Sequence, residues 1–263
     1  MNVNENAPWA LITGASKGLG KAIADELGSK GHNLVLVARS GEILAALAEA
    51  LAGKHQIQVR YFACDASHPD AATQLHDFCV SENLPISVLV NNAGIGIYDP
   101  FSESDLHALL RMNALNVDAV VRITHAFLPM LMVRPRAHIM NVASTGAYQP
   151  IPTMALYGAG KSYIRSFSWA LRRELRKSTV RVTCLSPGGV WTEFMDAAGN
   201  VAVSERARVF MMQADTCARA AVRGMLKGKA EVIPGWHNRF AAFMTRFAPT
   251  ALNVWVAGRI FEK

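Results

Sequence analysis

The stretch WALITGASKGLG, residues 9–20, decides the fold. Its first five residues form an apolar run of strand length, and the glycine-rich turn after them leads into Ile23 and Leu27 at helical spacing. Glycines permit a tight turn and let backbone amides approach a phosphate at the N-terminus of a helix. A strand, a glycine-rich turn and a helix in this order predict a nucleotide-binding βα unit at the start of the chain.

Similar apolar runs recur along the chain and alternate with helical patterns. These predicted strands are 9–13, 34–38, 57–63, 86–90, 138–142, 180–185 and 231–233. Several are almost entirely apolar, which is typical of strands buried on both faces of a parallel sheet with helices as crossovers. We therefore expect an α/β fold with one doubly wound, Rossmann-type sheet of about seven parallel strands and helices on both faces.

The 263 residues contain no low-complexity tract, linker or internal repeat, so we expect a single domain over residues 1–263. Residues 190–263 would form a substrate loop and a C-terminal helical extension. No signal sequence is recognised, and no later stretch looks apolar enough to span a bilayer, so we expect a cytoplasmic protein. The four cysteines lack metal-like spacing, which favours reduced, buried thiols and no metal site.

The formal net charge of +7 raises the question of nucleic-acid binding. Much of the excess lies at the end of one predicted helix, where cations complement the helix dipole. These cations are Arg172, Arg173, Arg176 and Lys177. Because no basic motif interleaved with aromatic residues accompanies them, we expect no nucleic-acid partner, while an anionic small molecule remains compatible with the charge.

Two further motifs follow the glycine-rich turn in a distinctive order. Asn91-Asn92-Ala93-Gly94 follows the fourth predicted strand, and Tyr157-Gly158-Ala159-Gly160-Lys161 opens a later helix. With the turn 13–20, which reads TGxxxGxG rather than GxGxxG, they resemble the short-chain dehydrogenase/reductase family over roughly residues 8–192. The resemblance implies an oxidoreductase that transfers a hydride between a nicotinamide and a carbonyl or alcohol carbon. It does not identify the substrate, which we expect to be small and apolar.

The resemblance also implies the residues that bind the cofactor. Those at the glycine turn and after the fourth strand are Gly14, Ser16, Lys17, Gly18, Leu19, Gly20, Asn92, Ala93 and Gly94. Asp65 would accept a hydrogen bond from the adenine amino group. Those beside the nicotinamide and its ribose are Tyr157, Lys161, Pro187, Gly188, Val190 and Thr192.

A tyrosine and a lysine four residues apart lie on one face of a helix, so the Lys161 ammonium can approach the Tyr157 phenol. Free tyrosine titrates near ~10, and a neighbouring cation favours the phenolate, so we expect a lowered pKa that makes Tyr157 a usable general acid or base. The resemblance adds Ser144, which would bond the substrate oxygen, and Asn113, which would hold a water next to the lysine. Taken singly, each of these residues could equally be a cap, turn or surface residue.

The cofactor preference is predicted from the residues after the second strand. Sites that prefer NAD commonly place an acid there, which accepts from the ribose 2′-hydroxyl. Here the chain reads Ala38-Arg39-Ser40, with no carboxylate. Because the Arg39 guanidinium suits phosphate oxygens and Lys17 and Ser16 can assist it, we expect NADP(H) as cofactor.

Two alternatives to a soluble enzyme are kept open. One is a non-catalytic nucleotide-binding sensor or scaffold on the same fold. The other comes from residues 236–261, where apolar residues at helical spacing predict two amphipathic helices separated by Pro249. These helices would pack against the substrate cleft or a second subunit, or lie at a membrane interface. The family resemblance itself implies a homo-oligomer, either a dimer or a tetramer.

Overall fold

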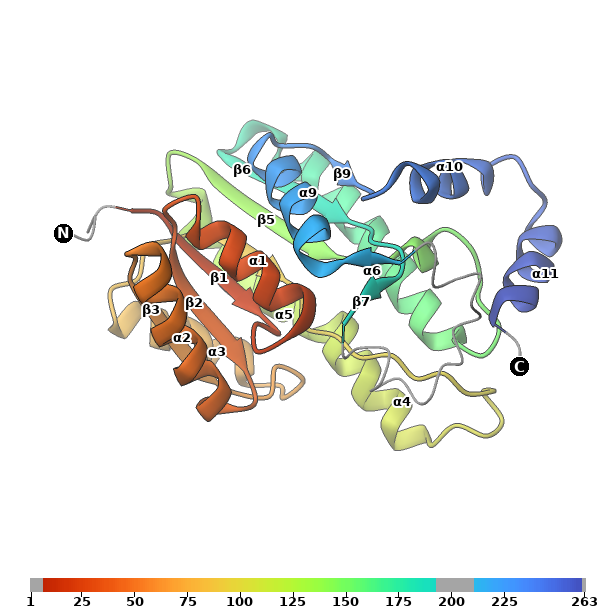
Figure 1. Cartoon of the computed structure of the whole chain (residues 1–263), viewed down its shortest axis with the longest axis horizontal. Coiled ribbons are helices and arrows are strands. Elements are labelled where there is room, and N and C mark those ends of the chain that lie inside the picture. Colours follow the sequence, from red (N-terminus) through yellow and green to blue (C-terminus); the bar gives the residue numbers. More distant parts are fainter. Residues whose placement is uncertain (1–6, 193–210, 262–263) are drawn as a thin grey trace.

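The computed structural model describes residues 7–192 and 211–261, so most of the predicted substrate loop lies outside the described residues. Its centre is a seven-stranded parallel sheet in the order β3-β2-β1-β4-β5-β6-β9 (Figure 1). The strands are β1 Trp9–Thr13, β2 Asn33–Ala38, β3 Val59–Ala63, β4 Ile86–Asn91, β5 Ala137–Val142, β6 Val180–Leu185 and β9 Glu231–Val232. This arrangement confirms the predicted doubly wound sheet. Strands β3 and β9 are shorter than their predicted ranges of 57–63 and 231–233.

Helices cover both faces of the sheet because successive side chains of a strand point to opposite faces. In β1, Ala10 and Ile12 pack with α1, α2 and α9, whereas Trp9 and Leu11 pack with α3, α5 and α6. These helices are α1 Gly18–Gly28, α2 Gly41–His55, α3 Ala71–Ser81, α5 Ala119–Met132, α6 Ala155–Glu174 and α9 Ala214–Leu226. A short parallel pair, β7 Val190–Trp191 and β8 Met212–Gln213, lies outside the main sheet. The four cysteines are unpaired, three of them buried and Cys64 half-buried.

One long helical run corrects the expectation that no stretch of the chain is apolar enough to span a bilayer. Helix α4, Leu106–Asn113, continues through a wider π-type turn at Ala114–Asp118 into α5, and the run Leu106–Met132 is long and apolar enough to cross a membrane. Its apolarity has a second explanation, because Ile123 and Phe127 are buried against the sheet and core helices meet the same criterion.

The C-terminal segment forms the two predicted helices. Helix α10, Trp236–Met244, and helix α11, Thr250–Phe261, are separated by Pro249. Figure 1 shows them beyond the sheet, at the opposite end of the molecule from β3. The side-chain amide of Asn253 donates to two backbone carbonyls that follow α10, at 3.1 and 3.3 Å, which couples the two helices.

Candidate active site

The glycine turn after β1 has a backbone that only glycine accommodates easily. Gly14 and Gly18 have φ values of +66° and +54°, in the left-handed region. A Cβ on Gly14 would lie 2.8 Å from the Ala93 Cα, and one on Gly20 would overlap the Gly14 carbonyl oxygen. The glycines therefore let the turn pack against the segment after β4 and place it at the N-terminus of α1, a position where backbone amides bind phosphate.

Thr13 joins this turn to the segment after β4. Its hydroxyl accepts hydrogen bonds from the backbone amides of Asn92 and Ala93, both at 3.0 Å. In return, the Asn92 side-chain amide donates to the carbonyls of Thr13 at 2.9 Å and Gly14 at 3.2 Å. The structure thus brings the two predicted cofactor motifs together. Sequence reasoning did not single out Thr13, although its position between the strand and the first glycine was a usable signal.

Ser144 and Tyr157 form a hydrogen-bonded pair at the carboxyl end of β5. Ser144 follows the strand and begins a short 3₁₀ turn, where its hydroxyl also accepts from the Gly146 amide at 3.1 Å. Tyr157 lies in the first turn of α6 and interacts with Ser144 through its hydroxyl. Burial raises the pKa of Tyr157 above its ordinary value, and the Ser144 hydrogen bond opposes this only in part. The expected lowering of the Tyr157 pKa is therefore wrong for the protein without cofactor.

Lys161 lies beneath the Tyr157 ring and is 5% exposed. Its Nζ is 5.7 Å from the ring centroid and donates to the Val142 carbonyl at 2.9 Å. Burial lowers the pKa of Lys161 to about 8. The prediction that Tyr157 and Lys161 share one helix face is confirmed, but burial affects both groups more strongly than their mutual attraction does.

The asparagine that the structure brings to Lys161 is Asn116, three residues after the predicted Asn113. Asn116 is 3% exposed, accepts from the Ile95 amide at 3.0 Å and donates to the Ile95 carbonyl at 2.8 Å. A Cβ on Gly94 would lie 3.0 Å from Asn116 Oδ1 and 3.6 Å from Lys161 Nζ, so these three residues meet. Asn113 ends α4, half-buried, before the wider turn that contains Asn116. The assignment accordingly moves to Asn116.

The residues predicted at the adenosine end lie after β1, β2 and β3. Lys17 and Arg39 are exposed, and within residues 7–192 and 211–261 neither forms an ion pair. Asp65 Oδ1 accepts from the backbone amide and hydroxyl of Ser67, at 2.9 and 2.7 Å. Burial tends to raise the pKa of Asp65, but the Ser67 bonds and the nearby Arg39 charge lower it overall. Ser16 and Leu19 are half-buried in the glycine turn.

The predicted nicotinamide residues follow β6. The Pro187 carbonyl accepts from the Thr145 amide at 2.8 Å, which ties this segment to the turn after Ser144. Gly188 lies against the side chain of Asn238 from α10. Val190 belongs to β7, and the Thr192 hydroxyl donates to its carbonyl at 3.4 Å. Neither Thr145 nor Asn238 stood out in the sequence.

Mostly apolar side chains surround Tyr157 on its open side. A hollow of about 10 Å³ is present there, too small for a substrate in this conformation. Its apolar lining consists of Ile97, Phe101, Leu109, Met112, Met154, Ala155 and Leu156. Asp99 and Ser104 add polar groups.

A comparison with protein families decides what this arrangement is. The family described as short chain dehydrogenase matches residues 8–201. The chain belongs to the short-chain dehydrogenase/reductase family. It is thus an NAD(P)-dependent oxidoreductase of the carbonyl/alcohol class.

Individual relatives agree with the family assignment. The chain is 33% identical over 183 residues to an uncharacterized oxidoreductase of Staphylococcus saprophyticus, covering 70% of this chain and 78% of that one. It is 36% identical to a very-long-chain 3-oxoacyl-CoA reductase of Meyerozyma guilliermondii, covering 66% of this chain and 54% of the relative, so it spans about half the length of that protein. Among solved structures, a short-chain dehydrogenase from Sphingobium yanoikuyae in complex with NADPH has a TM-score of 0.81 at 30% identity, covering 91% and 93% of the two chains.

The residues of this family member fit a nicotinamide dinucleotide. The positive φ values of Gly14 and Gly18, and the close contact of Gly14 with Ala93, fix a tight turn at the N-terminus of α1, where backbone amides can bind a pyrophosphate. Lys17 and Arg39, predicted for the adenosine end, follow β1 and β2, whereas Tyr157 and Lys161, predicted for the nicotinamide end, lie on α6. When bound, the nicotinamide supplies or accepts the hydride.

Proposed function

We propose that the protein is an NADP(H)-dependent reductase of small, apolar ketones or aldehydes that works in the cytoplasm. The observation that carries this proposal is the cluster of Ser144, Tyr157 and Lys161 at the carboxyl end of β5, next to a glycine turn suited to a pyrophosphate. A nucleotide-binding scaffold without turnover has no chemical need for these three side chains together. The unpaired cysteines are in keeping with a reducing compartment.

Each residue of the cluster has a distinct part in moving the proton. Ser144, already bonded to Tyr157, donates to the carbonyl oxygen and holds it next to the phenol. Tyr157 is a phenol rather than a phenolate because burial raises its pKa, so it donates its proton to that oxygen as the alcohol forms. Lys161, whose pKa is lowered to about 8, stabilises the phenolate that remains. Asn116 keeps the segment after β4 against Lys161 through its two bonds to Ile95.

The proposed preference for NADP(H) depends on Arg39 and Lys17. Both are exposed cations without an ion-pair partner in the described residues, and the residue directly after β2 is Arg39 rather than a carboxylate that could accept from a ribose hydroxyl. A 2′-phosphate would gain charge-assisted hydrogen bonds of about 1.5–3 kcal/mol each, before desolvation losses. We therefore expect NADPH to bind at least about tenfold more tightly than NADH.

Dissociation constants of NADPH and NADH for the wild type, Arg39→Ala and Lys17→Ala test this preference. Both substitutions should weaken NADPH binding and leave NADH binding almost unchanged. Arg60→Ala is the matched control, because Arg60 is an exposed arginine on β3 that pairs with Glu82 at 3.4 Å. Equal affinities for the two cofactors in the wild type would overturn the preference, as would a preference that Arg39→Ala leaves intact.

The apolar surroundings of Tyr157 support the substrate class. Ile97, Met154 and Leu156 are half-buried beside Tyr157 and can contact an apolar chain, and burying a methylene group stabilises binding by about 0.8 kcal/mol. One relative is named a very-long-chain 3-oxoacyl-CoA reductase, and the substrate in that name is much larger than the small ketones proposed for this chain. We expect kcat/KM with NADPH to rise along a series of aliphatic and cyclic ketones of increasing size and to stay low for polyhydroxylated ketones. A preference for the polyhydroxylated compounds would contradict the proposed substrate class.

A further inference from the structure

The two C-terminal helices carry a large exposed apolar surface, here called the tail surface. Trp236 is 80% exposed and Phe247 is 68% exposed. The full set is Trp236, Phe240, Phe243, Met244, Phe247, Leu252, Trp255 and Val256. Scattered exposed apolar residues are ordinary, but this many on two consecutive helices are typical of an interaction site.

The tail surface has a regular geometry. In α10 and just beyond it, Trp236, Phe240, Phe243 and Phe247 recur at steps of four, three and four residues, so they form one stripe. In α11, Leu252 and Trp255 are spaced in the same way. Asn253 couples the two helices through its bonds to the carbonyls that follow α10. The stripe and the α11 residues thus belong to one coupled unit.

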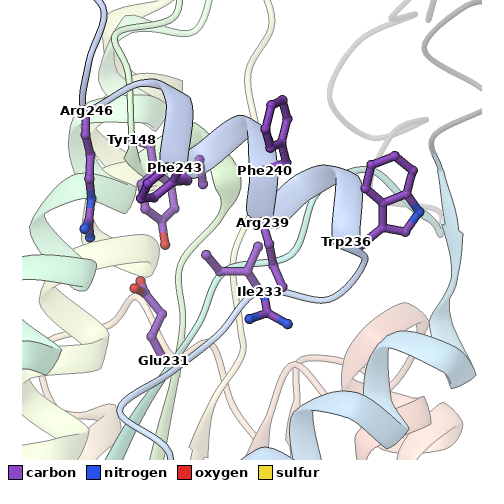
Figure 2. Close-up of a pocket in the computed structure, with 9 residues that line it drawn as sticks. Tyr148, Glu231, Ile233, Trp236, Arg239, Phe240, Phe243 and Arg246 are labelled. Atoms are coloured by element: carbon purple, nitrogen blue, oxygen red, sulfur yellow. The ribbon is translucent and has the colours of Figure 1, made fainter.

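Residues 236–261, which carry the tail surface, contain three arginines and no aspartate or glutamate. The arginines are Arg239, Arg246 and Arg259. The Arg259 guanidinium lies 5.3 Å from the centre of the Trp255 ring. Arg239 and Arg246 are exposed and line a hollow of about 430 Å³ between α10 and β9. Figure 2 shows both arginines on the side of α10 toward Glu231, and Phe240 on another side.

Among the described residues, the carboxylate that lines this hollow is Glu231, which already forms an ion pair with Arg165. Glu231 accepts from Arg165 Nε at 2.9 Å, and the Arg165 guanidinium also stacks 4.4 Å from the centre of the Tyr148 ring. Within the described residues, Arg239 and Arg246 have no ion-pair partner. Their charge is therefore available to an anion from outside the chain.

We propose that the tail surface docks on an anionic lipid bilayer. The aromatic stripe enters the boundary between headgroups and acyl chains, where helices with aromatic and basic residues bind in the membrane plane. The arginines at its side extend to the lipid phosphates, as long cationic side chains do at an interface. The chain is attached to the surface and does not cross it through this segment.

A second copy of the chain fits the tail surface less well than lipid does. In a two-fold symmetric contact the same patch meets itself. Three arginines from each copy would then be brought together without a carboxylate within residues 236–261 of either copy, and buried charges without partners are unfavourable. An anionic membrane supplies both the apolar phase and the negative charge.

Sedimentation with vesicles tests this proposal on the full chain. Phosphatidylcholine vesicles with and without phosphatidylglycerol are pelleted with wild-type protein, and bound protein is measured across a range of salt concentrations. We expect binding to the anionic vesicles that weakens with salt, because salt screens the arginine–phosphate attraction. Trp236 and Trp255 fluorescence should shift to shorter wavelength on binding.

Two pairs of variants separate the apolar and ionic contributions. Phe240→Ser with Phe243→Ser should reduce the vesicle partition coefficient at least about tenfold, since two exposed aromatic side chains no longer enter the interface. Arg239→Glu with Arg246→Glu should remove the preference for phosphatidylglycerol. The matched controls are Ile43→Ser with Val80→Ser, exposed apolar residues elsewhere, and Arg176→Glu with Lys177→Glu, exposed cations elsewhere. Both controls should bind as the wild type does, and far-ultraviolet circular dichroism checks that every variant folds.

Three results would overturn the proposal. The first is wild-type protein that stays in the supernatant with anionic vesicles at low salt. The second is vesicle binding that the tail variants and their controls lose equally. The third is an oligomer, measured by sedimentation velocity, that dissociates in Phe240→Ser with Phe243→Ser, because a second copy would then cover the tail surface.

Discussion

The backbone of Gly188 lies so close to the side-chain amide of Asn238 that a Cβ on residue 188 would be 2.5 Å from Asn238 Oδ1. Asn238 cannot easily withdraw, because its Nδ2 donates to the Pro234 carbonyl at 2.8 Å. The contact connects the segment after β6, which we predict to lie beside the nicotinamide, with the start of α10. We therefore expect Asn238 to help shape the cofactor site.

Gly188→Ala should therefore weaken cofactor binding. The added methyl group forces Asn238 to release Pro234 or displaces the segment after β6, and a lost hydrogen bond costs about 1 kcal/mol. We expect the Kd of NADPH to rise several-fold. Asn238→Ala in the same chain removes the clash, so the double variant should recover most of the affinity. If the two substitutions have additive effects, Gly188 and Asn238 are not coupled.

Tyr157→Phe should abolish turnover while the cofactor still binds. The substitution keeps the ring that packs beside Lys161 and removes the hydroxyl that meets Ser144. We expect kcat to fall by a factor of about 10² or more, the usual contribution of a general acid, with the Kd of NADPH changed by less than about threefold. Tyr163→Phe is the control, since Tyr163 is an exposed tyrosine on the same helix. Near-normal kcat in Tyr157→Phe would remove Tyr157 from the mechanism.

The variants Asn113→Ala and Asn116→Ala test which asparagine supports the site, the one before the wider turn or the one within it. Asn116 makes two hydrogen bonds to Ile95, so its loss should lower the free energy of unfolding by about 2 kcal/mol and decrease kcat as Gly94 moves relative to Lys161. Asn113→Ala should change the free energy of unfolding by less than about 0.5 kcal/mol, as half-exposed substitutions usually do. Urea denaturation and steady-state kinetics measure both. A larger kinetic loss in Asn113→Ala would restore the assignment made from the sequence.

The sheet was predictable because its strands are short and almost wholly apolar. β1, β4 and β5 are buried along their whole length, so their apolar composition alone predicts them, without knowledge of the strands that pair with them. At the edges this signal weakens. Residues 57 and 58 precede β3 although they continue its pattern, and β9 pairs with β6 over only two residues.

The positions of site residues were predictable where both residues lie in one sequence motif. They were not predictable where the site depends on contacts between segments that are far apart in the sequence. Tyr157 and Lys161 are one helical turn apart, so their proximity followed from spacing alone. Asn113 was assigned from the family resemblance, and no local pattern indicates the wider turn at 114–118, which follows Asn113 and contains Asn116. The direction of the Tyr157 pKa shift depends on burial, and a sequence shows the neighbouring cation but not the exclusion of water.

We expect the chain to form a homo-oligomer through the face of α6 that is exposed in the single chain. Trp169 is 44% exposed and Tyr163 is 49% exposed on that helix, and Leu110 on α4 is 56% exposed. Trp169→Asp with Tyr163→Asp should dissociate the oligomer, because it places two charges in an apolar contact. Sedimentation velocity at several protein concentrations measures this. Ile43→Asp, an exposed residue on α2, should leave the oligomer intact. A wild type that is monomeric at every concentration would contradict the prediction.

Protonation of His138 should destabilise the protein in mild acid. His138 lies in β5, is 3% exposed, and its pKa is lowered to about 4 by burial and by the nearby positive charges of Arg136, His32 and Arg181. In the unfolded chain its pKa is near ~6.5, so between these values the unfolded state binds more protons and the free energy of unfolding falls as the pH falls. This stability is present above about pH 6.5 and is lost progressively toward pH 4. From about pH 7 to pH 5 the linkage relation gives a loss of about 2 kcal/mol in the free energy of unfolding from this group.

In His138→Phe, urea denaturation at the two pH values should show a fall in the free energy of unfolding that is smaller than the wild-type fall by about this amount. His125→Phe, at an exposed histidine on α5, is the control and should behave as the wild type does. An equal fall in His138→Phe and wild type would show that His138 does not set the acid sensitivity.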